Sequence, residues 1–175
     1  MTRHRPALPT FVLALLFAAP AAAHDPYEVT MNATARPAQL ELVVTMSSPN
    51  ATSLLAPGTA RRRLTPQDFS AFHARLVAAG PGLFALTAAT APLPARTTRA
   101  RLTEENDVEF TLVFPRPVAG PLVFRAAFFA RLGEGCGGTL DVSDTSGRHL
   151  GSAQLSTAQD SLALSLPAPS PASTP

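Results

Sequence analysis

The stretch DVEFTLVF, residues 107–114, decides the fold class because its side chains alternate strictly between two kinds. Every second residue is large and apolar, namely Val108, Phe110, Leu112 and Phe114. The positions between them carry mainly polar side chains, including Glu109 and Thr111. Successive side chains of a strand point to opposite faces, so this pattern predicts a β-strand with one buried face and one face toward solvent.

Other stretches repeat this two-residue period. QLELVVTM, residues 39–46, carries apolar side chains at every second position, and so does DSLALSL, residues 160–166. YEVTMNAT, residues 27–34, is followed by ARPA, which predicts a turn, so it forms the first arm of a hairpin with 39–46. The strand pattern therefore extends over most of the chain.

Turn-forming residues predict how the strands are connected. The prolines of PRPVAGP, residues 115–121, lack the N–H that a sheet requires, so the chain should turn there and return as PLVFRAAFFARL, 121–132. LPARTTRARL, residues 93–102, precedes TEEND and should be a strand leading into the 107–114 strand. TLDVS and RHLGSAQL flank the turn-forming DTSG, residues 144–147, which predicts a further hairpin.

One region departs from the strand pattern. Thr65 can cap a helix, Pro66 suits the first helical position, and Asp68 complements the helix dipole. Apolar residues then recur at spacings of three and four, and Gly80 followed by Pro81 can end the helix. We therefore predict a helix near 66–79, and a shorter helical turn near NATSLLAP, residues 50–57.

Together these patterns predict a mainly β protein, an antiparallel β-sandwich of about seven to nine strands with one inserted α-helix near 66–79. The single cysteine, Cys136, cannot form an internal disulfide, so a hydrophobic core has to hold the fold together. About 140 residues are enough for one such domain.

The N-terminus predicts export. Arg3 and Arg5 precede an apolar run, and Ala21 and Ala23 suit a signal-peptidase cut after Ala23, although Ala19 and Ala21 also suit a cut after Ala21. We therefore expect a signal peptide at 1–23, a single domain at 24–166, and a disordered tail rich in Pro, Ser and Ala at 167–175. All basic residues are arginine, which is typical of a GC-rich bacterial genome and favours a periplasmic or secreted location.

The charge of the mature chain excludes one class of partner. Without residues 1–23, twelve arginines balance twelve acidic residues. No basic patch of the kind that binds nucleic acid remains. No later stretch is long and apolar enough to cross a membrane, so we expect no transmembrane segment in the mature chain.

His24 suggests a metal site. A cut after Ala23 would give His24 a free α-amine beside its imidazole, and these two nitrogens can bind one copper ion. A second imidazole would have to come from His73, on the predicted helix, or from His149, at the start of a hairpin arm. The alternative is that a histidine at a cleavage site is a coincidence and that His73 and His149 are ordinary polar surface.

Other polar groups have simpler interpretations beside a functional one. Cys136 in GEGCGG could be an exposed, reactive thiol or a small filler at a tight bend. Arg61, Arg62 and Arg63 could contact a partner or an anionic membrane, or could form a solvated loop. DVSDTSG lacks the spacing of a calcium loop and suits a hairpin turn. The chain also lacks the nucleophile-elbow, zinc-protease, phosphate-loop and dinucleotide motifs.

Three stretches carry a resemblance to a group of known proteins: HDPYEV, VEFTLVFPRPVAGPLVFRAAFFARL and GTLDVSDTSGRHLGSAQLS. They resemble the uncharacterised exported soluble domains associated with membrane proteins of the hydrogenase and urease accessory type. This resemblance implies a periplasmic β-sandwich linked to transition-metal handling through a membrane partner. This chain departs from the fused forms because no membrane span follows residue 166, which implies a partner in trans. A second likeness, to periplasmic copper-resistance and histidine-brace proteins, depends on His24 alone.

Three functions are therefore open. The first is a non-enzymatic, exported accessory or binding module with a membrane or envelope partner. The second is a copper-dependent oxidative enzyme with an N-terminal histidine brace. The third is a structural protein that packs against other envelope proteins.

Overall fold

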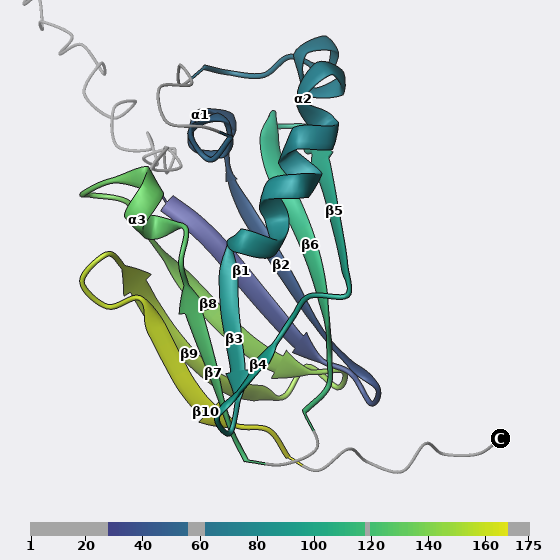
Figure 1. The fold of residues 1–175 in the computed structure, drawn as a ribbon, viewed down its shortest axis with the longest axis vertical. Coiled ribbons are helices and arrows are strands. Elements are labelled where there is room, and N and C mark those ends of the chain that lie inside the picture. The colour runs from purple at the N-terminus through teal and green to yellow at the C-terminus, as the bar shows by residue number, and fades with distance from the viewer. Residues whose placement is uncertain (1–27, 56–61, 118–119, 168–175) are drawn as a thin grey trace, which may run out of the picture.

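The computed structural model describes residues 28–55, 62–117 and 120–167. In these residues the chain forms ten strands in two sheets that pack face to face, with short helices at one end (Figure 1). The predicted mainly β, sandwich-like fold is confirmed, with one strand more than the upper number expected. The predicted signal peptide at 1–23, and all but Pro167 of the predicted tail, lie outside the described residues.

The larger sheet has six strands in the order β5-β6-β2-β1-β8-β9. Their bounds are β1 Glu28–Ala35, β2 Gln39–Ser47, β5 Thr97–Leu102, β6 Asp107–Pro115, β8 Gly137–Asp144 and β9 His149–Ser156. The hairpins predicted from local pattern, β1–β2, β5–β6 and β8–β9, are all present in antiparallel register. β6 lies between β5 and β2, so DVEFTLVF forms an interior strand.

The smaller sheet has four strands in the order β10-β7-β3-β4. Their bounds are β3 Phe84–Ala88, β4 Ala91–Leu93, β7 Pro121–Ala126 and β10 Ser161–Ser165. All three of its pairings are antiparallel. Its inner face covers the inner face of the six-stranded sheet.

The core lies between the two sheets and follows the two-residue period. The apolar side chains of β6 and β2 are buried at every second position, and those of the smaller sheet meet them from the other side. Full burial of a large apolar side chain contributes roughly 1.5–3 kcal/mol. The largest fully buried side chains of the sheets are Phe110, Phe114, Phe124, Met31, Leu40, Leu42 and Met46.

The six-stranded sheet is not wholly antiparallel. β1 pairs with β8 in parallel, with Val29 opposite Gly138 and Ala35 opposite Asp144. Roughly a hundred residues separate these two strands, so no turn between them could reveal the pairing. A Cβ at Gly138 would overlap the carbonyl oxygen of Val29, so only glycine fits where the two backbones meet.

The expected return of the chain after β6 differs from the structure. Beyond Pro115 the chain crosses to the other sheet, where β7 pairs with β3 and β10 instead of β6. The strand also ends earlier than the apolar sequence suggested, because Phe129–Leu132 forms the short helix α3. Phe128 and Phe129 are both fully buried at the end of the sandwich. A short run of apolar residues can therefore be buried here in a helical turn as well as in a strand.

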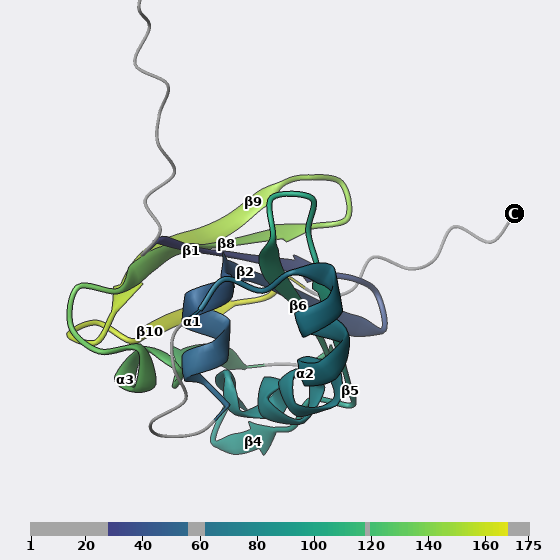
Figure 2. The same ribbon diagram turned by 90° about the horizontal axis from the view of Figure 1, so that it is seen from above.

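The predicted helix is confirmed as α2, Pro66–Ala79. The Thr65 hydroxyl accepts a hydrogen bond from the Asp68 N–H, and the Asp68 carboxylate accepts one from the Thr65 N–H, which forms a capping box. The Thr65 N–H and the Thr65 hydroxyl both donate to Asp68 Oδ2, and these two hydrogen bonds lower the pKa of Asp68. α2 packs beside β5 at the edge of the sandwich (Figure 2).

Two short segments complete the end of the sandwich that carries the helices. The predicted helical turn is α1, Ser48–Ser53, which continues directly from β2. The 3-10 turn η1, Gly80–Gly82, leads from α2 toward β3. No helix in the described part of the chain is long and apolar enough to cross a membrane.

Candidate functional site

The structure separates two of the three histidines considered as metal ligands. His73 is exposed on α2, beside β5, and its ring meets the edge of Phe69 at a centroid distance of 5.6 Å. His149 is exposed at the start of β9, at the opposite edge of the six-stranded sheet. Five strand spacings of about 4.8 Å place β5 and β9 about 24 Å apart. His73 and His149 therefore cannot bind the same metal ion.

His24 lies outside the described residues, so its distance to either histidine is not part of the structure. It precedes Glu28, the first residue of β1, by four residues, which span at most about 14 Å. Glu28 lies near Ser156 at one end of β9, and His149 lies at the other end. The copper hypothesis therefore depends on His24 with at most one of the two other imidazoles. Within the described ranges, no three His, Cys, Asp or Glu side chains are grouped as metal ligands would be.

The GEGCGG and DTSG motifs have structural roles. Cys136 is 3% exposed, and its Sγ lies 3.8 Å from the Leu132 carbonyl oxygen, so it is a buried filler and not an exposed thiol. In DTSG, the Asp144 carboxylate accepts hydrogen bonds from the Ser146 hydroxyl, the Arg148 N–H and the Ser146 N–H, which lower the pKa of Asp144 and close the hairpin turn.

The arginine run before α2 is partly explained by local contacts. Arg61 lies outside the described residues, and Arg63 is exposed. Arg62 forms an ion pair with Asp68 at 3.0 Å, and its guanidinium lies 5.0 Å from the centre of the Phe72 ring. Arg62 therefore supports the start of α2.

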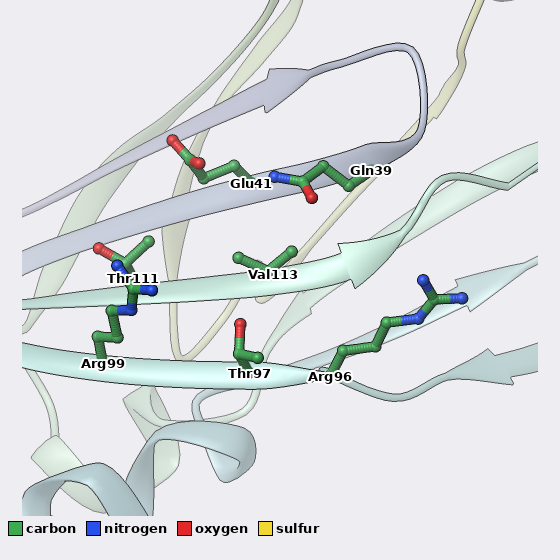
Figure 3. Close-up of a pocket in the computed structure, with 7 residues that line it drawn as sticks. All are labelled: Gln39, Glu41, Arg96, Thr97, Arg99, Thr111 and Val113. Carbon is green, nitrogen blue, oxygen red and sulfur yellow. The ribbon is translucent and has the colours of Figure 1, made fainter.

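A groove on the outer face of the six-stranded sheet is the strongest candidate for a binding site (Figure 3). It crosses β5, β6 and β2 and has a volume of about 410 Å³, within the range of small-ligand sites. The side chains that line it are Gln39 and Glu41 from β2, Thr111 and Val113 from β6, and Arg96, Thr97 and Arg99 at β5.

The strand period explains why these side chains share one face. Thr97, Arg99 and Arg101 alternate along β5 with inward-facing residues, so all three point outward. The register places Arg101 opposite Glu109 and Arg99 opposite Thr111. Arg99 and Arg101, which share the outer face of β5, therefore have different neighbours on β6.

Arg101 is neutralised by its neighbour. Its Nε and Nη2 atoms each donate to a carboxylate oxygen of Glu109 at 2.6 Å. This hydrogen bonding, together with the charge of Glu109, raises the pKa of the Arg101 guanidinium. A bidentate ion pair of this kind leaves little of Arg101 for a ligand.

Arg99 and Arg96 lack such a neighbour. Thr111 is neutral, and the next residue across the sheet from it is Val43. The other carboxylate at the groove, Glu41, accepts a hydrogen bond from Arg36 at 3.0 Å. In the part of the chain that the structure describes, neither Arg96 nor Arg99 has an ion-pair partner. The groove therefore presents two uncompensated positive charges on one wall.

Guanidinium groups bind carboxylates, phosphates and sulfates through paired N–H donors. In Figure 3, Arg99 extends over Thr111 at one end of the groove, whereas Arg96 extends in the opposite direction at the other end. The hydroxyls of Thr97 and Thr111 can add neutral hydrogen bonds. This arrangement can hold an anion.

Comparison with known proteins adds no relative. No protein-family model matches the chain, and no curated protein matches its sequence significantly.

Proposed function

We propose that this protein is an exported binding module that holds an anionic ligand in the groove formed by β5, β6 and β2. The observation that carries the proposal is the contrast on β5 between Arg101, which is paired with Glu109, and Arg96 and Arg99, which are unpaired. Uncompensated arginines beside a groove are a common basis for anion recognition.

Export and the periplasmic or secreted location are part of the same proposal, supported by the pattern of residues 1–23. The resemblance to domains that work with membrane accessory proteins supports a membrane or envelope partner in trans. The bound anion would then be a ligand that the module presents to, or receives from, that partner.

The test is a titration of the isotopically labelled protein with sulfate at constant ionic strength, followed by NMR amide shifts. We expect saturable shifts concentrated at Thr97, Arg99 and Thr111, and their loss in the double variant R96Q/R99Q. The double variant R125Q/R148Q removes the same charge from ion-paired arginines outside the groove, so it should bind like the wild type. Shifts that persist in R96Q/R99Q, or that are spread over the whole surface, contradict the proposal.

A further inference from the structure

The two walls of the groove differ in charge. Arg96 and Arg99 stand at β5, whereas Gln39 and Glu41 stand on β2, about two strand spacings or roughly 10 Å away. A ligand in the groove therefore meets cationic donors on one side and an amide and a carboxylate on the other (Figure 3). This asymmetry restricts the class of ligand.

Glu41 excludes a ligand that is anionic throughout. Arg36 donates to its Oε1, and its side chain remains 26% exposed, so the carboxylate still accepts hydrogen bonds at the groove. A polyphosphate or a nucleic-acid backbone would offer mainly acceptor oxygens to this acceptor carboxylate, which disfavours such a ligand on the β2 side. A carboxylate acceptor suits hydroxyl donors instead.

The middle of the groove suits a hydroxylated ring. Thr97 and Thr111 offer hydroxyls that can donate and accept, and Val113, opposite Thr97 on β6, adds an apolar surface beside them. A volume of about 410 Å³ is small for a binding site, which limits the ligand to about one or two rings.

We infer that the groove binds a sugar acid, with the carboxylate of a uronic acid unit at Arg99 and its ring hydroxyls at Thr97, Thr111, Gln39 and Glu41. This inference rests on the proposed function, since it names the class of anion that the same groove would take. A free amino acid also carries a carboxylate, but its ammonium group would compete with Arg36 for Glu41 and its backbone lacks the hydroxyls.

The experiment compares four probes by the same NMR titration: D-glucuronate, D-glucose, inorganic sulfate and glycine. D-glucuronate should bind about tenfold more tightly than D-glucose, since only the acid forms charge-assisted hydrogen bonds with Arg99. It should also bind more tightly than sulfate or glycine, which lack the ring hydroxyls.

A second pair of variants tests the hydroxyls. The double variant T97V/T111V keeps the β-branched shape and removes both hydroxyls, so D-glucuronate should bind several-fold more weakly while sulfate binding stays unchanged. T87V, on the outer face of the other sheet, is the matched control and should leave both affinities unchanged.

The outcomes separate this inference from the proposed function. If sulfate binds at the groove and D-glucuronate is no tighter, the sugar class is wrong and anion binding stands. If D-glucose equals D-glucuronate, or if glycine exceeds it, the sugar acid is also excluded. If no anion shifts the groove amides in an arginine-dependent way, both are overturned.

Discussion

Gly138 shows how one residue without a side chain permits the parallel pairing of β1 with β8 in the larger sheet. It lies opposite Val29 where β8 runs beside β1, and a Cβ there would overlap the Val29 carbonyl oxygen. The atom in the way is backbone inside a sheet, which cannot move aside as the end of a flexible side chain can. The position therefore requires glycine for space and not for its freedom of rotation.

We predict that G138A destabilises the protein by about 3 kcal/mol, because the added methyl has to push β8 away from β1. The measurement is the free energy of unfolding in urea. G82A is the matched control, since nothing lies within 4 Å of a Cβ at Gly82, and it should change stability by less than about 0.5 kcal/mol. Equal stability of G138A and G82A would mean that β1 and β8 are not paired in this register.

Copper binding at His24 predicts a requirement for a free amine at that residue. A chain that begins at His24 should bind Cu(II) about tenfold or more tightly than a variant with one alanine before His24, because amine and imidazole bind together. Competition with a copper chelator measures the difference. Single variants H73A and H149A identify which imidazole contributes, since the two cannot both do so. The copper hypothesis fails if the added alanine has no effect.

Among the helices and strands, α2 is the one whose bounds follow most clearly from local sequence. Thr65, Pro66 and Asp68 occupy the cap, the first position and the third position of the helix, as their chemistry favours. Only Leu76 is fully buried among its residues, so the cap matters more than it would for a helix inside a core.

T65A should therefore lower the free energy of unfolding by about 1 kcal/mol, through loss of the hydroxyl that accepts from Asp68 N–H. T65S keeps that hydroxyl and should stay close to the wild type. Urea unfolding of the three proteins makes the comparison. A T65S variant as unstable as T65A would show that the methyl group, and not the cap, is responsible.

Local elements were predictable and distant pairings were not. The three hairpins of the larger sheet and α2 follow from periods, caps and turns that lie within a few residues of one another. The parallel pairing of β1 with β8, and the move of the chain to the other sheet before β7, depend on contacts between segments far apart in sequence. Alternation of side chains fixes which face is buried, but it does not say which strand lies next to which.

The sequence around residues 97–102 could have predicted the arginines of the groove, but the histidines were the residues considered as a site. Residues 97–102 carry Arg99 and Arg101 two positions apart, and the short turn that follows sets the register with Glu109 and Thr111. From this register alone, one arginine should be paired and the other free. Local sequence does not predict that Glu41 and its partner Arg36 lie beside Thr111 and Val113. β2 pairs with β6, but no short turn connects the two strands and sets their register.

The Arg116 side chain connects parts of the fold that are far apart in sequence. Arg116, just after β6, donates through Nη1 to the Arg36 carbonyl oxygen at 2.8 Å and through Nη2 to the Pro167 carbonyl oxygen at 2.5 Å. It therefore ties the turn between β1 and β2 to the segment after β10. The described residues also share one hydrophobic core, with contributions from both sheets.

Export predicts a defined processed product. In a bacterial host, the protein recovered from the periplasm or medium should begin at His24, as measured by intact mass and N-terminal sequencing. Replacing Ala21 and Ala23 with leucine should block the cut and leave the longer chain in the cell fraction. Recovery of the unprocessed chain from the cytoplasm alone would contradict a secretory signal.

The parallel contact between β1 and β8 has a consequence for the order in which the protein is made. β1 is among the first parts of the domain to emerge, yet the strand that covers one of its edges ends only at Asp144. Until then the β1–β2 hairpin carries an open hydrogen-bonding edge, a feature that promotes association between chains. Chains that end before residue 137 should therefore be prone to aggregation. A chaperone that holds unfolded chains should raise the yield of intact protein.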